Sequence, residues 1–270
     1  MALGPKGPTN QTRTESTSII MLNPSIDHCI WIKEKGIAFI FIPKVACTSW
    51  KLYLYQLMGN KITDSITYKN VHNINSLSLP YVKAMDVVEQ NEFKHALENN
   101  ELRVCGMIRE PKARVLSGYL DKVLHHSNPK SSFSKVVIPA IQRQQGISDG
   151  RRPTFKEFLD WNIHTEQTNK QKINDHWRPM CHLLGIGDVS IISKDQIKLW
   201  DLSQLDIAVK WFNEIFGREL IFPKSQQLGP RQTNKSESKI SDYYGREETE
   251  KWCMLYERDA ILHKKVIAEW

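Results

Sequence analysis

The sequence predicts an α/β fold built on a central, mostly parallel sheet that is flanked by helices. Residues 37–42 and 102–108 are short and largely apolar, which is typical of strands buried on both faces of a parallel sheet. Each run is followed by a segment with helical periodicity. Alternation of strands and helices is the pattern of α/β domains, and it continues along most of the chain.

The first strand leads directly into a loop that is suited to an anion. A proline ends the run at 37–42, and a helix is expected from about residue 48 to residue 58. The first N–H groups of a helix have no internal partner, and the helix dipole favours negative charge there. Lys44 adds a positive charge, and Thr48 and Ser49 add hydroxyl donors. The Walker pattern G-x-x-x-x-G-K-[ST] is absent, so this would be a different kind of phosphate-type loop.

The second strand, at 102–108, is followed by Arg109 and, eight positions later, by Ser117. The helix between them is amphipathic. Its apolar stripe comprises Val115, Leu116, Tyr119, Leu120 and Val123, and its polar stripe comprises Glu110, Arg114, Ser117 and Asp121. We therefore expect Arg109 and Ser117 to face one cleft while the apolar stripe packs on the sheet.

The remaining elements follow from periodicity and from helix-breaking residues. Residues 127–152 lack clear periodicity and are expected to form a long excursion, either a binding loop or a mobile connection. The other expected elements are helices at 84–99, 154–163 and 208–216, a strand at 189–193, a polar segment at 223–239 and a C-terminal helix from about residue 246.

Bulk composition bounds the class of protein. The 270 residues, 40% hydrophobic, suffice for a single domain, expected at 26–270 after a flexible polar tail at 1–25. The net charge of +7 suits an anionic partner, and by itself it does not choose between a nucleotide, an acidic glycan and a nucleic acid. The five cysteines form no C-x-x-C pair, residues 1–18 lack a signal-peptide core, and no run of 18 apolar residues occurs. These features predict a cytoplasmic protein with reduced cysteines and no transmembrane segment.

Two motifs together resemble a known family. The segment 43–51, Pro-Lys-Val-Ala-Cys-Thr-Ser-Trp-Lys, resembles the 5′-phosphosulfate loop of PAPS-dependent sulfotransferases, and 109–122 resembles their 3′-phosphate site. The likeness is greatest to the carbohydrate sulfotransferases of the HNK-1/chondroitin type (sulfotransferase family 2). It implies a P-loop-like sulfotransferase fold, PAPS as the sulfate donor without a metal, and transfer to a hydroxyl of an acceptor glycan. Animal members of that family are usually anchored in the Golgi membrane, which this chain is expected not to share.

The resemblance also implies roles for individual residues. Lys44 would stabilise the leaving oxygen, and Arg109 with Ser117 would bind the 3′-phosphate. The sulfate and 5′-phosphate would be held by the loop, namely Lys44, Val45, Ala46, Cys47, Thr48, Ser49 and Trp50. Weaker matches place Arg231, Thr233 and Lys235 in a loop over the nucleotide, although Asn234 stands where the family often has glycine. His176 and Arg178, in a His-Trp-Arg-Pro element, would border the acceptor.

A base is needed to take the proton of the acceptor hydroxyl, and a group that titrates near neutrality suits this task. His72, which we expect near the end of another strand, is the candidate, with a structural or surface histidine as the alternative. His95, His125 and His126 lie in segments that give histidine no catalytic role. A zinc site at His176, Cys181 and His182 is disfavoured because no fourth well-spaced ligand follows.

Other functions explain fewer of the sequence motifs than a sulfotransferase does. A nucleotide-dependent kinase would need a Walker lysine and an acidic Mg²⁺ motif, and neither follows the loop. A basic nucleic-acid-binding protein would interleave aromatic and basic residues, whereas the aromatic residues here fall on helical core stripes. A non-catalytic relative that only binds PAP shares all the motifs. The sequence fixes neither the acceptor nor the oligomeric state.

Overall fold

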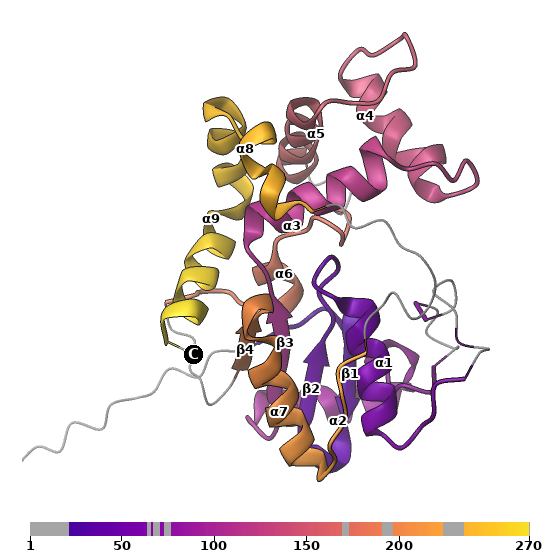
Figure 1. Cartoon of the computed structure of the whole chain (residues 1–270), viewed down its shortest axis with the longest axis vertical. Coiled ribbons are helices and arrows are strands. Elements are labelled where there is room, and N and C mark those ends of the chain that lie inside the picture. Colours follow the sequence, from indigo (N-terminus) through magenta and orange to yellow (C-terminus); the bar gives the residue numbers. More distant parts are fainter. Residues whose placement is uncertain are drawn as a thin grey trace, which may run out of the picture.

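The computed structural model describes residues 22–63, 66, 71–72, 77–168, 173–190, 197–223 and 235–269. Figure 1 shows a sheet at one end of the molecule and a group of helices stacked above the carboxyl ends of its parallel strands. The α/β class with a mostly parallel sheet is therefore confirmed.

The sheet has four strands in the order β1-β2-β3-β4. Strand β1 (Cys29–Ile32) runs antiparallel to β2 (Ile37–Ile40), whereas β2, β3 (Arg103–Ile108) and β4 (Ile197–Asp201) are parallel. The strand expected at 189–193 is not found at Val189 and Ser190, and residues 191–193 lie outside the described residues. The strand of this region is β4, whose side chains are almost all buried.

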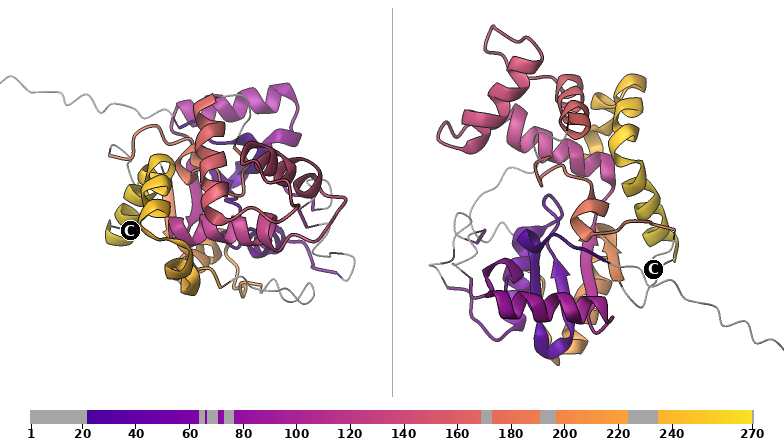
Figure 2. Two further views of the ribbon diagram at one scale, coloured as in Figure 1. Left: turned by 90° about the horizontal axis from the view of Figure 1, so that it is seen from above. Right: turned by 180° about the vertical axis from the view of Figure 1, so that it is seen from behind.

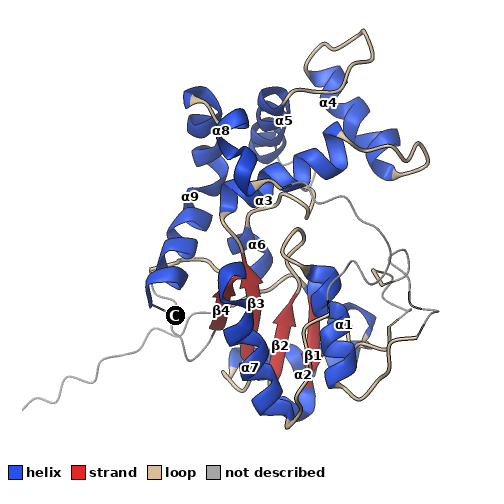
Figure 3. Cartoon of the chain, viewed as in Figure 1, coloured by secondary structure: helices blue, strands red, loops and turns tan. Residues whose placement is uncertain are grey.

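Helices make up most of the rest of the described chain (Figure 3). They are α1 (Cys47–Leu57), α2 (Val87–Glu98), α3 (Pro111–Tyr119), α4 (Ile138–Gln144), α5 (Phe155–Thr168), α6 (Met180–Leu184), α7 (Leu205–Phe216), α8 (Ile240–Tyr243) and α9 (Arg246–Glu269). The helices predicted at 48–58, 84–99, 154–163, 208–216 and from residue 246 are thus confirmed. Gly217 ends α7 with a left-handed backbone (φ 62°), which glycine adopts without steric cost.

Both faces of the sheet are covered. On one face, Phe39 of β2 contacts Trp50 of α1 and Phe212 of α7, with ring centroids 5.0 and 5.7 Å apart. On the other face, Trp31 of β1 packs edge-on against Phe93 of α2 at 5.7 Å. The front and rear views accordingly show α7 and α2 on opposite sides of the strands (Figures 1 and 2). A buried parallel sheet of this kind explains the near-continuous apolar runs of the sequence.

A second hydrophobic cluster lies above the sheet and is formed by α3, α5 and α9. The apolar stripe of α3, including Leu116 and Tyr119, packs here against Phe158 and Tyr256. The expectation that this stripe packs on the sheet is therefore wrong. The reason is that α3 starts at the end of β3 and runs across the top of the sheet, where α5 and α9 offer the apolar surface.

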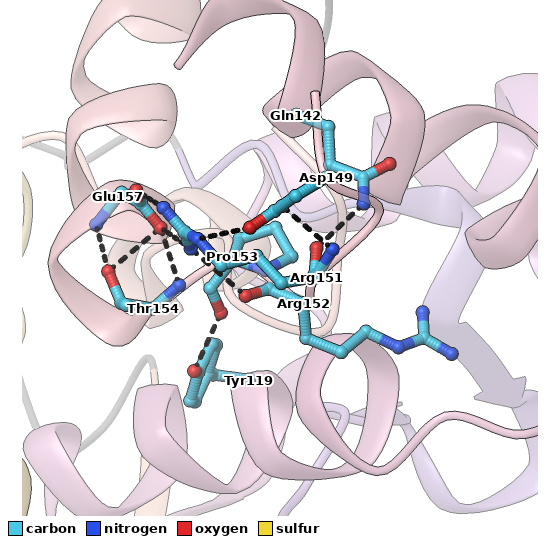
Figure 4. Close-up of polar contacts among 8 residues, drawn as sticks. All are labelled: Tyr119, Gln142, Asp149, Arg151, Arg152, Pro153, Thr154 and Glu157. Carbon is cyan, nitrogen blue, oxygen red and sulfur yellow. Dashed lines mark hydrogen bonds and ion pairs between the residues drawn. The ribbon is translucent and has the colours of Figure 1, made fainter. Parts of the chain in front are cut away.

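The excursion at 127–152 is more regular than its sequence suggests. It contains a π-helical turn, Phe133–Val137, that continues into α4, so residues 133–144 are helical where the sequence predicts a loop. Polar contacts fix its end near α5 (Figure 4): the amide of Gln142 donates to the carbonyl of Arg151 (2.8 Å), and Arg151 forms a two-pronged ion pair with Glu157. The hydroxyl of Tyr119 donates to the carbonyl of Pro153 at 2.9 Å, which ties the segment to α3.

Among the helices that the structure describes, none has both the length and the apolar character needed to span a bilayer. All five cysteines are free thiols, and Cys29, Cys105 and Cys181 are buried as small core residues.

Candidate active site

The ends of β2 and β3 bring two predicted cations together. Lys44 follows β2 and Arg109 follows β3, and the two strands are parallel neighbours in which Ile40 pairs with Gly106. Nη1 of Arg109 donates to the backbone carbonyl of Lys44 at 3.1 Å. The carboxyl ends of adjacent parallel strands thus form one site, as in other open α/β sheets.

The binding loop, defined here as residues 43–49, has a backbone shaped for an anion. Lys44 (φ 71°) and Ala46 (φ 48°) both adopt the left-handed conformation, which is uncommon for residues with a side chain. Ala46 is the N-cap of α1 and supplies no side-chain cap. The first N–H groups of α1, from Cys47 onward, therefore lack the usual capping oxygen. This arrangement fits a phosphate or sulfate group, whose oxygens accept from such N–H groups.

Two anchors hold the loop in this shape. Trp50 is buried and packs against Phe222 at 5.0 Å, in addition to its contact with Phe39, so its side chain belongs to the core. Arg114 of α3 is completely buried, and its Nε donates to the carbonyl of Pro43 at 3.1 Å. Its two terminal nitrogens donate to the carbonyls of Asp175 (3.0 Å) and Arg178 (2.7 Å). Arg114 thus joins the binding loop to the segment that begins at Asn174.

The side chain of Lys44 is only 8% exposed, and its ammonium contacts a carboxylate. Nζ of Lys44 lies 2.9 Å from Oδ2 of Asp121, which also pairs with Lys122 at 3.2 Å. Burial alone would raise the pKa of Asp121, but the charges and hydrogen bonds of the two lysines outweigh it and hold this pKa well below its usual range. Asp121 is therefore ionised at neutral pH.

The guanidinium of Arg109 has further partners from a distant part of the chain. Nη2 donates to the hydroxyl of Ser236 at 2.9 Å, and Nε donates to Oε1 of Glu237 at 2.6 Å. Nη2 also contacts Glu237 closely. Ser117 lies two turns into α3 and is buried. The arginine that we expect to bind the 3′-phosphate therefore already binds a hydroxyl and an anionic group.

His72 lies beside the binding loop, in a turn and not at the end of a strand, so that expectation is wrong. Its side chain is exposed, and its Nε2 lies 2.9 Å from the Thr48 hydroxyl. This contact places an imidazole at the mouth of the loop.

The predicted acceptor-side residues have different surroundings. Burial, followed by the charges of Lys122 and Lys44, lowers the pKa of His176 to about 3, so that this ring is neutral in the physiological range. The guanidinium of Arg178 is largely buried and pairs with Asp175 at 2.8 Å and with the carbonyl of Ile173 at 2.9 Å. The structure thus places His176 near the site lysines and gives Arg178 internal partners.

The predicted loop over the nucleotide is described only in part. Arg231 and Thr233 lie outside the described residues. Lys235 is exposed and has a left-handed backbone (φ 45°), and it immediately precedes Ser236. Within the described part of the chain, no group of three or more His, Cys, Asp or Glu residues is arranged to hold a metal ion.

Sequence reasoning missed Asp121, Ser236 and Glu237 as site residues. Asp121 carried a signal, because it lies on the same polar helical stripe as Ser117. Ser236 and Glu237 directly follow Lys235 of the predicted loop over the nucleotide, but no local pattern predicts their contact with Arg109, which spans more than 120 positions of sequence.

Comparison with known proteins agrees with these features. The family described as "Sulfotransferase family" matches residues 27–251. The chain is 23% identical to carbohydrate sulfotransferase 12 of Xenopus laevis over 184 residues, which cover 59% of this chain and 43% of that protein. It is 25% identical to carbohydrate sulfotransferase 11 of Rattus norvegicus, covering 60% of this chain and 47% of that protein, and 25% identical to carbohydrate sulfotransferase 14 of Danio rerio, covering 62% and 44%. The chain spans about half the length of these relatives, and no solved structure matches it significantly. Because the family match covers both strand ends and most of the chain, this protein belongs to the sulfotransferase family.

Proposed function

We propose that the chain is a PAPS-dependent sulfotransferase that moves a sulfuryl group to a hydroxyl of a carbohydrate by direct in-line transfer. The observation that carries the proposal is the contact between Arg109 and the backbone of Lys44. This contact supports the proposal because a nucleotide with anionic groups on two positions of its ribose would need a guanidinium for one phosphate close to a loop that binds the other anion. The names of the curated relatives support a carbohydrate as the acceptor.

The residues at the two strand ends would bind different parts of the cofactor. The N–H groups at the start of α1 and the hydroxyls of Thr48 and Ser49 would hold the 5′-phosphosulfate. Arg109 and Ser117 would hold the 3′-phosphate, for which a planar guanidinium offers paired donors. When bound, PAPS supplies the activated sulfuryl group.

Lys44 would stabilise the charge that develops on the oxygen bridging sulfur and phosphorus. Its ammonium is largely buried, so that its charge acts through a medium of lower polarity than water. A preoriented donor of this kind lowers the barrier without reorganisation during the reaction. Positioning and charge stabilisation then account for most of the catalysis, as in phosphoryl transfer.

His72 would accept the proton of the attacking hydroxyl. Its ring shares a hydrogen bond with the Thr48 hydroxyl, which belongs to the binding loop, so that an acceptor entering at this side would meet both groups. His176, which is neutral, would serve as a hydrogen-bond partner of the acceptor and not as a charged group.

Calorimetric titration with PAP tests the cofactor assignment. We expect the wild-type chain to bind PAP and Arg109→Ala to bind it about 10- to 100-fold more weakly, because a charge-assisted hydrogen-bond pair is lost. Lys44→Ala should weaken binding less and abolish transfer. Arg246→Ala, which removes an exposed arginine paired with Glu250, is the matched control and should bind like the wild type. Equal affinity in Arg109→Ala and Arg246→Ala would refute the 3′-phosphate site.

Transfer of labelled sulfate from PAPS to a panel of glycans tests the activity itself. We expect label in at least one glycan and none with Lys44→Ala. Near-normal turnover of His72→Ala at saturating acceptor would remove the assignment of the base.

A further inference from the structure

A single carboxylate, Asp121, connects the two lysines of the site. Its Oδ2 accepts from Nζ of Lys44 at 2.9 Å and from Nζ of Lys122 at 3.2 Å. The side chain of Asp121 is 30% exposed, whereas that of Lys44 is 8% exposed. A buried ammonium without a counter-charge favours the neutral amine. The neighbouring carboxylate therefore keeps Lys44 in the charged form that leaving-group stabilisation needs.

The backbone around Asp121 is fixed by packing. Asp121 lies in a π-helical turn, Leu120–Leu124, that extends α3, and the N–H of His125 donates to the carbonyl of Leu120 at 2.9 Å. Such turns are rare and are frequent at functional sites. Leu120 and Val123 are fully buried in the second hydrophobic cluster, so that the turn cannot rotate freely. Asp121 is thus presented to Lys44 from a rigid element.

The charges around Asp121 and Lys44 determine which role the carboxylate of Asp121 can have. Among the described residues, the charges that act on Asp121 are those of Lys44 and Lys122, both positive, and Asp121 acts in turn on the neutral ring of His176. An ionised carboxylate held between two ammonium groups is a weak proton acceptor. It is suited to orienting a cation and unsuited to removing the proton of a hydroxyl.

We propose that Asp121 is a positioning residue that holds the ammonium of Lys44, charged and directed, at the binding loop. The inference rests on the proposed function, because it assigns to Lys44 the leaving oxygen. It adds a feature that the function alone does not require: Asp121 is itself an anion beside a site for anions. It should therefore improve turnover while opposing the binding of the phosphosulfate group.

The variant Asp121→Asn separates these two effects, since it keeps the shape of the side chain and removes its charge. We expect kcat to fall at least tenfold, while the affinity for PAP stays equal to that of the wild type or rises up to about tenfold. The basic limb of the kcat profile should move to lower pH, because Lys44 loses its counter-charge. Asp121→Glu keeps the charge and should recover part of kcat.

Asp160→Asn is the matched control, since Asp160 also pairs with a lysine, Lys251, at 2.5 Å on α5 and α9. It should leave kcat, PAP affinity and the pH profile unchanged. A purely structural role of Asp121 would lower kcat and PAP affinity together and would not move the pH profile, which would overturn the proposal. A kcat of Asp121→Asn within twofold of the wild type would overturn it as well.

The same measurements distinguish this inference from the function on which it rests. If the wild-type chain failed to bind PAP or to transfer sulfate, the proposed function would be refuted first. If it did both while Asp121→Asn behaved like Asp160→Asn, only the role of Asp121 would be refuted. Should Asp121→Asn fail to fold, Asp121→Ser, which also removes the charge, is measured in its place: a basic limb at lower pH with PAP affinity retained supports the proposal, and an unaltered limb contradicts it.

Discussion

Arg109 donates to a carboxylate of its own chain at the place where we expect a phosphate. Glu237 accepts from two of its nitrogens, and Ser236 accepts from one. Because a guanidinium has a fixed fork of donors, a bound phosphate and Glu237 would compete for the same face. The hydroxyl of Ser236 is neutral and buried, and it could remain beside a phosphate.

Glu237→Gln should therefore increase the affinity for PAP. The side chain of Glu237 is more than half exposed, so solvent weakens its ion pair, and we expect a gain of only about twofold to fivefold. Calorimetric titration at low ionic strength measures it. Glu250→Gln, which removes a carboxylate from another exposed arginine pair, should leave the affinity unchanged. A weaker affinity of Glu237→Gln would show that this carboxylate supports the site and does not compete.

At the scale of elements, α3 closely approaches the segment that begins at Asn174. Gly118 lies against the backbone of His176, and a Cβ at this glycine would come within 2.9 Å of the His176 carbonyl oxygen. Arg114, one turn earlier, donates to carbonyls of the same segment. The atom nearest to this Cβ thus belongs to the backbone, which cannot make room by changing a side-chain rotamer.

Gly118→Ala should consequently destabilise the protein by about 1–3 kcal/mol, since the added methyl group must push the backbones apart. Urea unfolding followed by circular dichroism measures this loss. Gly187→Ala is the control, because its Cβ would meet nothing within 4 Å. Equal midpoints for the two variants would contradict the close packing of α3.

The elements also show what can be predicted from a sequence such as this one. Apolar runs and helix-ending residues located β2, β3, α1, α7 and α9, because these signals are local. The sequence predicts a strand at 189–193 and none at β4, because the sequence of β4, Ile-Lys-Leu-Trp-Asp, mixes polar and apolar residues. The segment 127–152 shows no clear periodicity because its π-helical turn departs from the 3.6-residue period on which the prediction depends.

Within the site, too, local features can be predicted from the sequence and long-range contacts cannot. The sequence predicts Lys44 and Arg109 each at the end of a strand, and the family resemblance implies that both bind one cofactor. The structure shows that these two strands are parallel neighbours and share one edge of the sheet. The partners of these cations, Glu237 above all, depend on how distant helices pack, and no local pattern encodes that.

At the scale of the whole molecule, α9 joins the second hydrophobic cluster to the sheet. Its Asp259 is buried and accepts from the N–H groups of Met180 and Cys181 at the start of α6, at 2.7 and 2.9 Å. Further along, Nε2 of His263 lies 2.9 Å from Asp201 at the end of β4. Burial alone would raise the pKa of Asp201, but hydrogen bonds with His263 and Ser203 lower it to about 2.

This pKa predicts how stability depends on acid. A carboxyl whose folded-state pKa lies below its unfolded value of about 4 stabilises the fold above pH 4, and this contribution is lost as the pH falls from about 4 to about 2. In Asp201→Asn, the drop in the free energy of unfolding between pH 5 and pH 2 should therefore be smaller than in the wild type by about 2 kcal/mol. Chemical unfolding at a series of pH values measures it, with the exposed Asp206→Asn as control. Parallel curves for Asp201→Asn and wild type would refute the coupling of α9 to β4.

The completely buried guanidinium of Arg114 has a consequence for how the candidate active site is assembled. One of its hydrogen bonds goes to the carbonyl of Pro43 in the binding loop, and the other two go to carbonyls of the segment that begins at Asn174. The loop that we propose for the donor and the segment that we propose for the acceptor are therefore connected through one buried side chain. If the proposed function holds, we expect a ligand that rigidifies one of these two segments to rigidify the other, so that selectivity for the acceptor and affinity for the nucleotide would be coupled.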